Sequence, residues 1–578
     1  MTRGVERILV RRPAAHPLAL GHPRADNPRV DTPAVVVALL LAVIPLVAIA
    51  RRFNIPYPIV LVLGGAALGF LPELSLPELE PKVVFSVFLP PLLYWESVNA
   101  PTKELHRNGR WIVSLAIGLV VATALSVAGV MRWVLPGLPW AAALVLGAVL
   151  GPTDELAFVP MAERLRVPRR TTAVIEGESL LNDATALLLF AVAVDIVQSG
   201  HASASDAFVR LLWSGLGGIA FGAIICGAVL LSWRLLRDQQ LGGVTAVLIP
   251  WLVYLPAERL HVSGVLALVV AGLIFSRFGP IRVMSPRARL QVVAFWEVIV
   301  FILNGILFCL VGLQLRPLLD GLVSQHYSPS TLAWCAVAVS LTVILVRLIW
   351  VYGELAVWLA IRRLKKPQPL TPDQVGAAWC RSTVIAWTGL RGGVSLAAAL
   401  AIPTMAAGQP FPHRDLFIFV TFAVILVTLV GQGLTLPTVI RRLGVVDDGA
   451  DALEEDLAGR RLARVALDRL DALAADLPPS VVETLRQRFS PRANMAPLLF
   501  GPASDGVGQI TAEQATLDAA FDRAEREMLR AQRVAALDLR DRGEIDNTVM
   551  RRILASIDLA LIRYEIGDPL AEGRASAG

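Results

Sequence analysis

Charged residues are scarce in this chain of 578 residues. Asp, Glu, Lys and Arg make up 17% of it, whereas 55% is hydrophobic. Soluble domains usually carry about 25% charged residues, so the composition indicates a membrane protein with several spanning helices. The net charge of +6 does not indicate nucleic-acid binding, because the basic residues lie in short segments between apolar runs. We therefore expect a lipid bilayer around the chain and no nucleic-acid partner.

Motifs for metals, nucleotides and covalent catalysis are missing as well. The chain has no glycine-rich phosphate-binding loop, and its seven histidines are scattered. Its four cysteines lie in apolar segments without metal-ligand spacing, as is typical of small buried hydrophobic residues; they are Cys226, Cys309, Cys335 and Cys380. We expect a protein that is not an enzyme, has no cofactor and does not use ATP directly.

The two ends of the chain differ from its middle. Residues 1–32 are rich in Arg and Pro and lack the apolar core of a signal peptide, so we expect either a disordered arm or a start codon assigned too far upstream. Residues 444–578 are rich in Ala, Leu, Arg, Asp and Glu at helical spacing, which predicts a cytoplasmic tail of two or three amphipathic helices. This tail is either a packing and dimer-support module or a regulatory domain.

Between the ends, apolar segments recur that are long enough to span a bilayer, for which about 20 residues are needed. They predict an all-α polytopic membrane protein with thirteen spans over residues 33–442. The predicted spans are residues 33–50, 57–72, 83–99, 111–135, 139–162, 171–198, 206–234, 242–258, 261–277, 290–315, 329–362, 377–404 and 415–441.

Basic residues alternate strictly between the segments that connect these spans. With the C-terminus in the cytoplasm, the cytoplasmic connections hold 21 Lys and Arg residues and the opposite connections hold five. Because cytoplasmic loops are enriched in Lys and Arg, this asymmetry supports both the number of spans and a cytoplasmic tail. Six arginines in the N-terminal arm oppose this orientation.

The sixth span contains the polar run Gly177-Glu-Ser-Leu-Leu-Asn-Asp183. A carboxylate in mid-membrane costs about 2.5–3.5 kcal/mol, so such acids are functional candidates. Ser179 and Asp183 are four residues apart and share one helix face, where they offer oxygen ligands for a small cation. Glu178 and Asn182 share the neighbouring face, and Glu178 requires a cationic partner of its own.

The fifth span is expected to break near its middle at Gly151-Pro-Thr-Asp154, because a proline cannot donate the helical hydrogen bond. The carbonyls that this break frees, together with Thr153 and Asp154, are potential cation ligands. The twelfth span contains Gly389-Leu-Arg-Gly-Gly393, which predicts a second unwound stretch. Arg391 within it would neutralise helix-terminus dipoles or Asp154.

Two interrupted spans that run in opposite directions indicate a transporter built from inverted repeats. The fifth and twelfth spans are seven apart, so they run in opposite directions. We therefore predict crossed, interrupted helices, with residues 33–198 and 242–441 as the repeats and residues 206–234 as the connector.

Further charged residues lie within the predicted spans. Arg347 is in the middle of the eleventh span and must have a carboxylate partner, for which Glu178 is the best candidate and Glu354 the competitor. Glu96, at the end of the third span, either faces the ion cavity or marks the end of the helix. Glu297 in the tenth span is a weaker candidate with no motif around it.

With these motifs, residues 33–442 resemble the cation:proton antiporter-1 family, which contains the bacterial NhaP and animal NHE types of sodium/proton exchanger. The resemblance rests on the run Phe-Leu-Pro-Pro-Leu-Leu at residues 88–93, on the pair Thr153-Asp154, on residues 177–183, on Arg347 and on residues 389–393. One departure is that proline precedes Thr153-Asp154, whereas many members have it after them, and Glu155 follows here and could add a charge.

The resemblance implies a role for each of these residues. Asp183 would bind the cation or the proton, and Ser179, Glu96 and the Thr153 carbonyl would complete the sodium shell. Asp154 and Asn182 would support this shell. Glu178 and Arg347 would form a structural ion pair, with Arg391 supporting the helix break. The resemblance also implies a homodimer in which a core of spans 4–6 and 11–13 moves like an elevator against a dimerisation domain.

The predicted function is exchange of sodium, or lithium, for protons across the cell membrane in pH and sodium homeostasis. A cation and a proton compete for one carboxylate, since each of them neutralises it. Asn182 cannot carry a proton, so the Asn182-Asp183 pair offers one exchangeable charge and predicts electroneutral 1:1 exchange. The membrane potential, worth about 2.3 kcal/mol per charge per 100 mV, would then not drive it. A potassium/proton antiporter and a cation channel or non-transporting sensor are the alternatives.

Overall fold

The computed structural model describes residues 32–71, 84–199, 204–236, 239–279, 284–324, 327–365, 370–406, 408–445, 449–489 and 512–566. The expected N-terminal arm, residues 1–32, lies outside this range except for its last residue. The described chain is mainly helical, with one short antiparallel hairpin that pairs Met405 with Pro410. The all-helical fold class that the sequence predicts is thereby confirmed.

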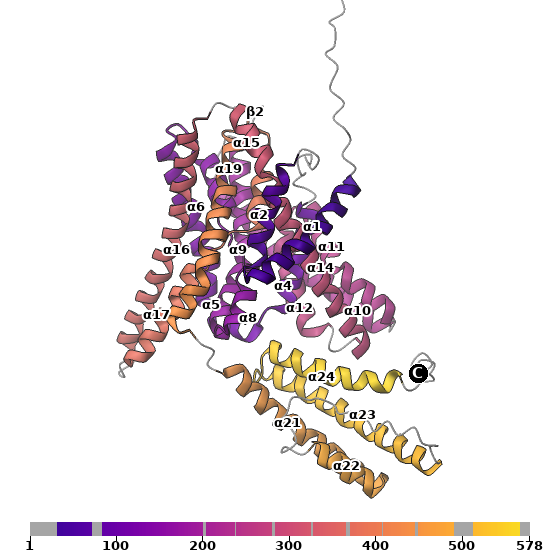
Figure 1. The fold of residues 1–578 in the computed structure, drawn as a ribbon. Coiled ribbons are helices and arrows are strands. Elements are labelled where there is room, and N and C mark those ends of the chain that lie inside the picture. The colour runs from indigo at the N-terminus through magenta and orange to yellow at the C-terminus, as the bar shows by residue number, and fades with distance from the viewer. Residues whose placement is uncertain are drawn as a thin grey trace, which may run out of the picture.

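A bundle of apolar helices forms the larger part of the molecule, and the C-terminal helices lie against one end of it (Figure 1). Serine and threonine side chains cap several of its helices; Ser263, for example, accepts a hydrogen bond from the Leu266 amide, as helix N-termini require. The first half of the bundle consists of α1 (Thr32–Phe53), α2 (Tyr57–Gly69), the π-helical turn η2 (Val84–Phe88), α4 (Leu89–Asn99), α5 (Thr102–Val113), the π-helical turn η3 (Ser114–Leu119), α6 (Val120–Val134), α7 (Trp140–Val149), α8 (Val159–Leu165), α9 (Arg169–Ser199) and α10 (Ala204–Leu236).

The second half of the bundle contains the hairpin and the remaining apolar helices. They are α11 (Gln239–Arg259), α12 (Gly264–Phe278), α14 (Pro286–Leu313), α15 (Leu315–Ser324), α16 (Pro329–Lys365), α17 (Pro372–Trp387), α18 (Gly393–Leu400), β1 (Met405–Ala406), β2 (Gln409–Pro410), α19 (Arg414–Leu426), the π-helical turn η4 (Val427–Gln432) and α20 (Gly433–Leu443).

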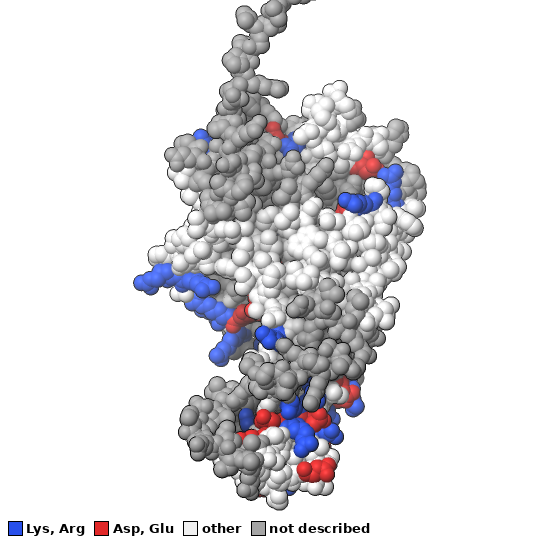
Figure 2. All heavy atoms as spheres, turned by 90° about the vertical axis from the view of Figure 1, so that its right-hand side faces the viewer, with Lys and Arg blue, Asp and Glu red and all other residues white. Residues whose placement is uncertain are grey.

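Six helical stretches are long and apolar enough to cross a membrane: residues 102–134, 169–199, 209–233, 286–319, 329–364 and 414–443. Three shorter apolar helices, α2, α7 and α12, accompany them. Across the middle of the bundle, Figure 2 shows a broad belt of mostly uncharged described residues, with arginines and lysines at the edge that faces the C-terminal helices. The described charges thus leave an apolar zone of the kind that a bilayer would cover.

Each predicted span coincides with one helix or with consecutive helical pieces, but three of them differ in detail. The span predicted at 111–135 begins earlier, at Thr102, because the basic first turns of α5 continue the same helix outside the apolar zone. The spans predicted at 139–162 and 377–404 are each divided in two, at residues 150–158 and 388–392. Both divisions contain the glycines or the proline that predicted a break.

Helices α2 and α14 cross so closely that their glycines have no room for a side chain. A Cβ on Gly312 would lie 2.1 Å from the carbonyl oxygen of Val62, and one on Gly65 would lie 2.2 Å from that of Cys309. Small residues permit such backbone contact between helices in a membrane. The contact fixes the first helices of the chain to its middle.

We expect Gly312→Ala to destabilise the protein, because the new methyl group would press against the α2 backbone and not against a movable side chain. Overpacking of this kind costs about 1–3 kcal/mol. Gly129→Ala is the matched control, since a Cβ at Gly129 would have no heavy atom within 4 Å. Thermal unfolding midpoints in the same detergent measure the difference, and equal midpoints for both variants would contradict the close crossing.

The C-terminal helices pack into a bundle with a hydrophobic interior of its own, which includes Leu470, Leu485, Met528 and Leu561. Basic residues of the apolar bundle hold this unit in place through acidic partners. Its helices are α21 (Ala450–Leu473), the 3-10 turn η5 (Ala474–Asp476), α22 (Pro479–Phe489), α23 (Ala512–Asp541) and α24 (Asn547–Ile566).

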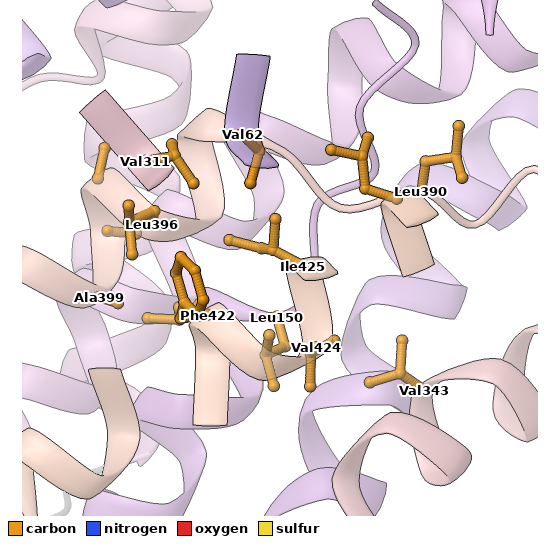
Figure 3. Close-up of a cluster of buried hydrophobic side chains, with 14 of the residues drawn as sticks. Val62, Leu150, Val311, Val343, Leu390, Leu396, Ala399, Phe422, Val424 and Ile425 are labelled. Atoms are coloured by element: carbon orange, nitrogen blue, oxygen red, sulfur yellow. The ribbon is translucent and has the colours of Figure 1, made fainter. Parts of the chain in front are cut away.

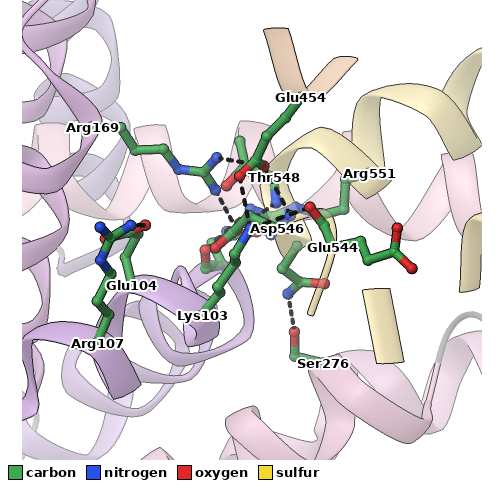
Figure 4. A network of polar contacts seen from close by, with 12 residues as sticks. Lys103, Glu104, Arg107, Arg169, Ser276, Glu454, Glu544, Asp546, Thr548 and Arg551 are labelled. Atoms are coloured by element: carbon green, nitrogen blue, oxygen red, sulfur yellow. Dashed lines mark hydrogen bonds and ion pairs between the residues drawn. The ribbon is translucent and has the colours of Figure 1, made fainter. Parts of the chain in front are cut away.

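Figure 4 shows the contact between the two units, where Arg169 of α9 lies between Glu454 and Asp546. Lys103 of α5 also reaches Glu454, with 2.7 Å between its Nζ and the carboxylate. On another helix of the apolar bundle, Arg289 of α14 pairs with the buried Asp558 at 2.7 Å. The C-terminal unit is therefore bound to several helices of the apolar bundle at once.

Candidate ion-binding site

The break between α7 and α8 lies inside the bundle, surrounded by other chain segments. Helix α7 ends at Val149, and Pro152, without an N–H, cannot continue its hydrogen bonds. The guanidinium of Arg391, which is fully buried, donates to the freed carbonyls of Gly151 and Pro152. The charge of Arg391 therefore lies at the negative end of α7, the position that one of its two expected roles requires.

The second break, between α17 and α18, crosses the first. The Asp154 amide donates to the Leu390 carbonyl at 2.8 Å, which joins the two breaks directly. A Cβ on Gly392 would lie 1.5 Å from Oδ2 of Asp154, so only glycine fits there. The Asp154 carboxylate accepts hydrogen bonds from the amides of Leu156 and Gly393, and Gly393 begins α18.

A cluster of buried apolar side chains holds this crossing rigidly from the side. Leu150 and Leu390, one from each break, lie in it together with Ile425 and Phe422 of α19 (Figure 3). Non-helical backbone at membrane depth is tolerated where protein buries it or where it lines a cavity. Here the apolar cluster buries one part of the crossing, and another part lines a small cavity.

This cavity has a volume of about 40 Å³ and lies between α4, α9 and the two breaks. Since one water needs about 10–15 Å³, it has room for a cation with only a few waters. Six polar or acidic residues line it: Glu96, Thr153, Asp154, Ser179, Asp183 and Ser395. The structure thus brings together five of the six residues that the sequence suggested for cation and proton binding.

The sixth, Asn182, faces the break and does not line the cavity. Its side-chain amide donates to the Thr153 hydroxyl at 2.7 Å, and that hydroxyl donates to Glu178 at 3.1 Å. On the adjacent face of α9, the Ser179 hydroxyl donates to the Thr153 carbonyl at 3.0 Å. Thr153 therefore connects both polar faces of α9 to the break.

Glu178 and Arg347 form a buried ion pair, and each side chain is only 1% exposed. One of its contacts, between Arg347 Nη2 and Glu178 Oε2, measures 2.8 Å. Arg347 Nε also donates to the Ile385 carbonyl at 3.1 Å, three residues before the second break. Glu354, the competing partner, lies instead beside Ser114.

Asp183 lies in the cavity wall with 5% of its surface exposed. Within the described chain, no Lys, Arg or His forms an ion pair with it, in contrast to Glu178. Its polar neighbours in the cavity offer hydroxyl, carbonyl and carboxylate oxygens, the ligand types that small hard cations prefer, while apolar side chains form the rest of the wall. The site can therefore offer a cation several oxygens, among them the carboxylates of Glu96, Asp154 and Asp183, none of which forms an ion pair within the described chain.

Ser395 was not suggested by the sequence. Its hydroxyl is buried and has no hydrogen-bond partner among the described residues. It lies two residues after Gly393, in the first turn of α18. Its position next to the expected helix break is the one feature of the sequence that could have indicated a place in the cavity. Glu155 is buried but does not line the cavity, and Glu297 is exposed on α14 away from it.

A larger cavity of about 1,010 Å³ opens at the end of the bundle that is opposite the C-terminal helices. Leu187 and Leu400 line it, and each lies one turn beyond a residue of the small cavity, Asp183 and Ala397 respectively. Glu258, which also lines it, brings a carboxylate to its wall. About one helical turn thus separates the small cavity from the larger one.

A family model described as "Sodium/hydrogen exchanger, transmembrane" matches residues 36–442. An uncharacterized Na(+)/H(+) exchanger of Mycobacterium tuberculosis is 38% identical over 530 residues, which cover 91% of this chain and 95% of that protein. The Na(+)/H(+) antiporter ApNhaP of Aphanothece halophytica is 34% identical over 77% of this chain and 80% of its own length.

Two further relatives extend the comparison. A sodium, potassium, lithium and rubidium/H(+) antiporter of Bacillus subtilis is 33% identical over 70% of this chain and 60% of that protein. Among solved structures, the sodium proton antiporter MjNhaP1 of Methanocaldococcus jannaschii at pH 8 matches with a TM-score of 0.55 and 18% identity, over 71% of this chain and 98% of that one. At this identity the structural match supports the fold alone.

Proposed function

The chain belongs to the sodium/hydrogen exchanger family, so it is a multi-pass membrane protein that exchanges monovalent cations for protons and is not an enzyme, and we propose that it exchanges one sodium ion for one proton. The observation that supports this proposal is the buried Asp183 carboxylate in a small cavity that also contains hydroxyl and carboxylate groups, where no Lys, Arg or His of the described chain forms an ion pair with it. Such a group must bind either a cation or a proton, because an isolated buried charge is costly.

Competition at this carboxylate gives the exchange. When sodium binds, Asp183 gives up its proton, and when a proton returns, sodium leaves. Ser179, Glu96 and the Thr153 carbonyl supply the remaining ligands in this proposal, and Asp154 and Asn182 hold the break in shape. The Thr153 carbonyl already accepts from Ser179, but a carbonyl oxygen has a second lone pair for a cation.

A stoichiometry of one to one follows from the chemistry of the pair Asn182-Asp183. Asn182 carries no titratable proton and donates to Thr153, so only Asp183 of this pair can exchange a charge. Movement of one sodium ion against one proton transfers no net charge, and the membrane potential then has no effect on it. Ion and pH gradients alone would drive the cycle.

The arrangement in the membrane is also part of the proposal. Residues 33–442 would form the transport domain with thirteen spans, in which repeats 33–198 and 242–441 are joined by 206–234. The two breaks that cross through Asp154 and Leu390 support an inverted repeat. The excess of Lys and Arg on the side of the C-terminal helices supports a cell-membrane protein with residues 444–578 as a cytoplasmic tail.

A homodimer with an elevator-like core is proposed from the family resemblance, with spans 4–6 and 11–13 as the moving part. Both breaks and the buried pair Glu178–Arg347 lie within these spans, so they would move as one body. The cavity of about 1,010 Å³ lies between α9 and α18 on one side and α11 and α12 on the other. It supports access to Asp183 from the side away from the tail.

Purified protein in liposomes with an imposed pH gradient tests the proposal. We expect sodium, and lithium, to dissipate the gradient, and we expect the rate to be unchanged when valinomycin and potassium clamp the potential. A rate that changes with the potential would contradict 1:1 exchange. Current without proton movement would instead indicate a channel, and no response to any cation would indicate a sensor.

Potassium is the second candidate cation, because the Bacillus subtilis relative is named for sodium, potassium, lithium and rubidium. The cavity lining does not separate the two ions by ligand type, since both accept hydroxyl, carbonyl and carboxylate oxygens. The same assay with sodium and potassium at equal concentrations decides between them. In that comparison the potential must be clamped without valinomycin, which would itself carry potassium.

A further inference from the structure

A second cavity, of about 580 Å³, lies on the side of the bundle that faces the C-terminal helices. Three helices of the apolar bundle form its walls, and α23 and α24 close it from the end. One wall is a single face of α5, on which Leu105, Gly109 and Ile112 follow at helical spacing. Its volume is within the range of about 300–1,000 Å³ that is usual for ligand sites.

The wall of this cavity is apolar at one end and cationic at the other. Leu180 of α9 and Leu273 of α12 also line the cavity, and Leu273 and Leu105 of α5 pack against the apolar cluster that contains Leu180. Arg277 of α12 and Arg540 of α23 line the end that is next to the C-terminal helices. A ligand that filled the whole cavity would need an apolar part and an anionic part in this order.

The buried guanidinium of Arg540 also points to a ligand in this cavity. The residue is 8% exposed, yet its buried Nη1 makes no hydrogen bond within the described chain. Its other nitrogens bind the Asp541 carboxylate, at 2.8 and 3.1 Å, and the Arg277 carbonyl, at 3.3 Å. A buried guanidinium N–H without an acceptor is costly, so an anionic oxygen in the cavity would stabilise it.

The charges near this end also favour an anion. The guanidinium of Arg277 lies 3.8 Å from Asp541, which Arg540 already occupies, so one carboxylate is shared between two arginines. Among these three side chains the positive charges exceed the negative ones by one. Guanidinium groups bind phosphate oxygens in pairs, and basic pockets between helices at the cytoplasmic side of membranes bind lipid head groups.

We propose that this cavity binds one anionic glycerophospholipid from the leaflet next to the C-terminal helices. Its phosphate lies at Arg540 and Arg277, and an acyl chain lies along the α5 face beside Gly109. Because the cavity is bounded by α5 and α9 as well as by α12 and α23, the bound lipid connects the apolar bundle to the C-terminal unit. This inference does not depend on which cation is transported.

Native mass spectrometry of the full-length protein in detergent, with lipids added in increasing amounts, tests the charge preference. We expect about one phosphatidylglycerol per chain to remain bound, and we expect phosphatidylethanolamine with the same acyl chains to bind less tightly. Equal retention of the two lipids would overturn the proposal, because the arginines would then not select the head group. Retention of neither lipid would overturn it as well.

Arg540→Gln, compared with Arg530→Gln, tests the head-group position. The two arginines lie on the same helix, but Arg530 is exposed and pairs with Glu527 outside the cavity. We expect Arg540→Gln to weaken phosphatidylglycerol binding about fivefold or more, as expected for one basic side chain. Equal binding by both variants would contradict this position.

Gly109→Leu tests the acyl position while all contacts of Arg540 stay in place. A Cβ at Gly109 meets no heavy atom within 4 Å, so leucine would extend into the cavity without a clash. We expect it to abolish tight phosphatidylglycerol binding, whereas Gly129→Leu, a matched change on α6, leaves binding unchanged. If Gly109→Leu binds as well as wild type and millimolar inorganic phosphate displaces the lipid, the site is one for a soluble anion and the lipid proposal fails.

Discussion

Asp183→Asn is expected to abolish cation/proton exchange in liposomes, down to the rate of protein-free vesicles. Asparagine keeps the size of the side chain and its hydrogen-bonding oxygen, but it can neither lose a proton nor balance the charge of a cation. The cavity would lose the one carboxylate that α9 contributes to its wall. The measurement is the cation-induced dissipation of a pH gradient at several sodium concentrations.

Asp195→Asn is the matched control for this change. Asp195 lies on the same helix, α9, and its side chain is half exposed and pairs with the exposed Arg210. We expect this variant to exchange at the wild-type rate. Retained exchange by Asp183→Asn, or an equal loss in both variants, would show that the cavity carboxylate is not the exchanging group.

Helical spacing and helix-breaking residues predicted much of what surrounds this carboxylate. Ser179 and Asp183 are four residues apart, and both line the cavity. Pro152 predicted a break because a missing N–H acts locally, whatever the rest of the chain does. Helical spacing and helix breaks depend only on residues that are close together in the chain, so they can be predicted from the sequence alone.

Spacing did not predict which neighbour each face would meet. Asn182 shares a face with Glu178, as expected, but this face meets the Thr153 hydroxyl and not the cavity. Ser395 enters the cavity only because α18 starts beside α4 and α9. Periodicity gives the angle of a side chain around its own helix, whereas its partners depend on how distant helices pack.

The contact between α5 and the C-terminal unit could not be predicted for the same reason. Lys103 and Glu454 are 351 positions apart in the chain, yet they are 2.7 Å apart in space. Basic residues at a membrane interface usually indicate orientation only. Here Lys103 and Arg169 also bind the acidic residues of another unit.

Arg347→Met is expected to be the most destabilising change of a single charge in the apolar bundle. It would leave the Glu178 carboxylate buried without a counter-charge, and loss of one partner of a buried pair costs about 3–5 kcal/mol. It would also remove one of two side-chain donors to the Ile385 carbonyl, which then keeps only the Thr388 hydroxyl. The measurement is the thermal unfolding midpoint of the purified protein, together with its yield in the membrane.

The double variant Glu178→Gln/Arg347→Met separates the charge from the packing. Glutamine keeps an acceptor for the Thr153 hydroxyl but carries no charge, so we expect the double variant to be more stable than Arg347→Met alone. Arg210→Met, which breaks the exposed pair with Asp195, is the control and is expected to cost no more than about 1 kcal/mol. Glu178 also accepts a hydrogen bond from Thr153, which lies in the break between α7 and α8. We therefore expect the double variant to exchange more slowly only to the extent that this break changes shape. If the double variant is as unstable as Arg347→Met, the uncompensated charge is not the cause.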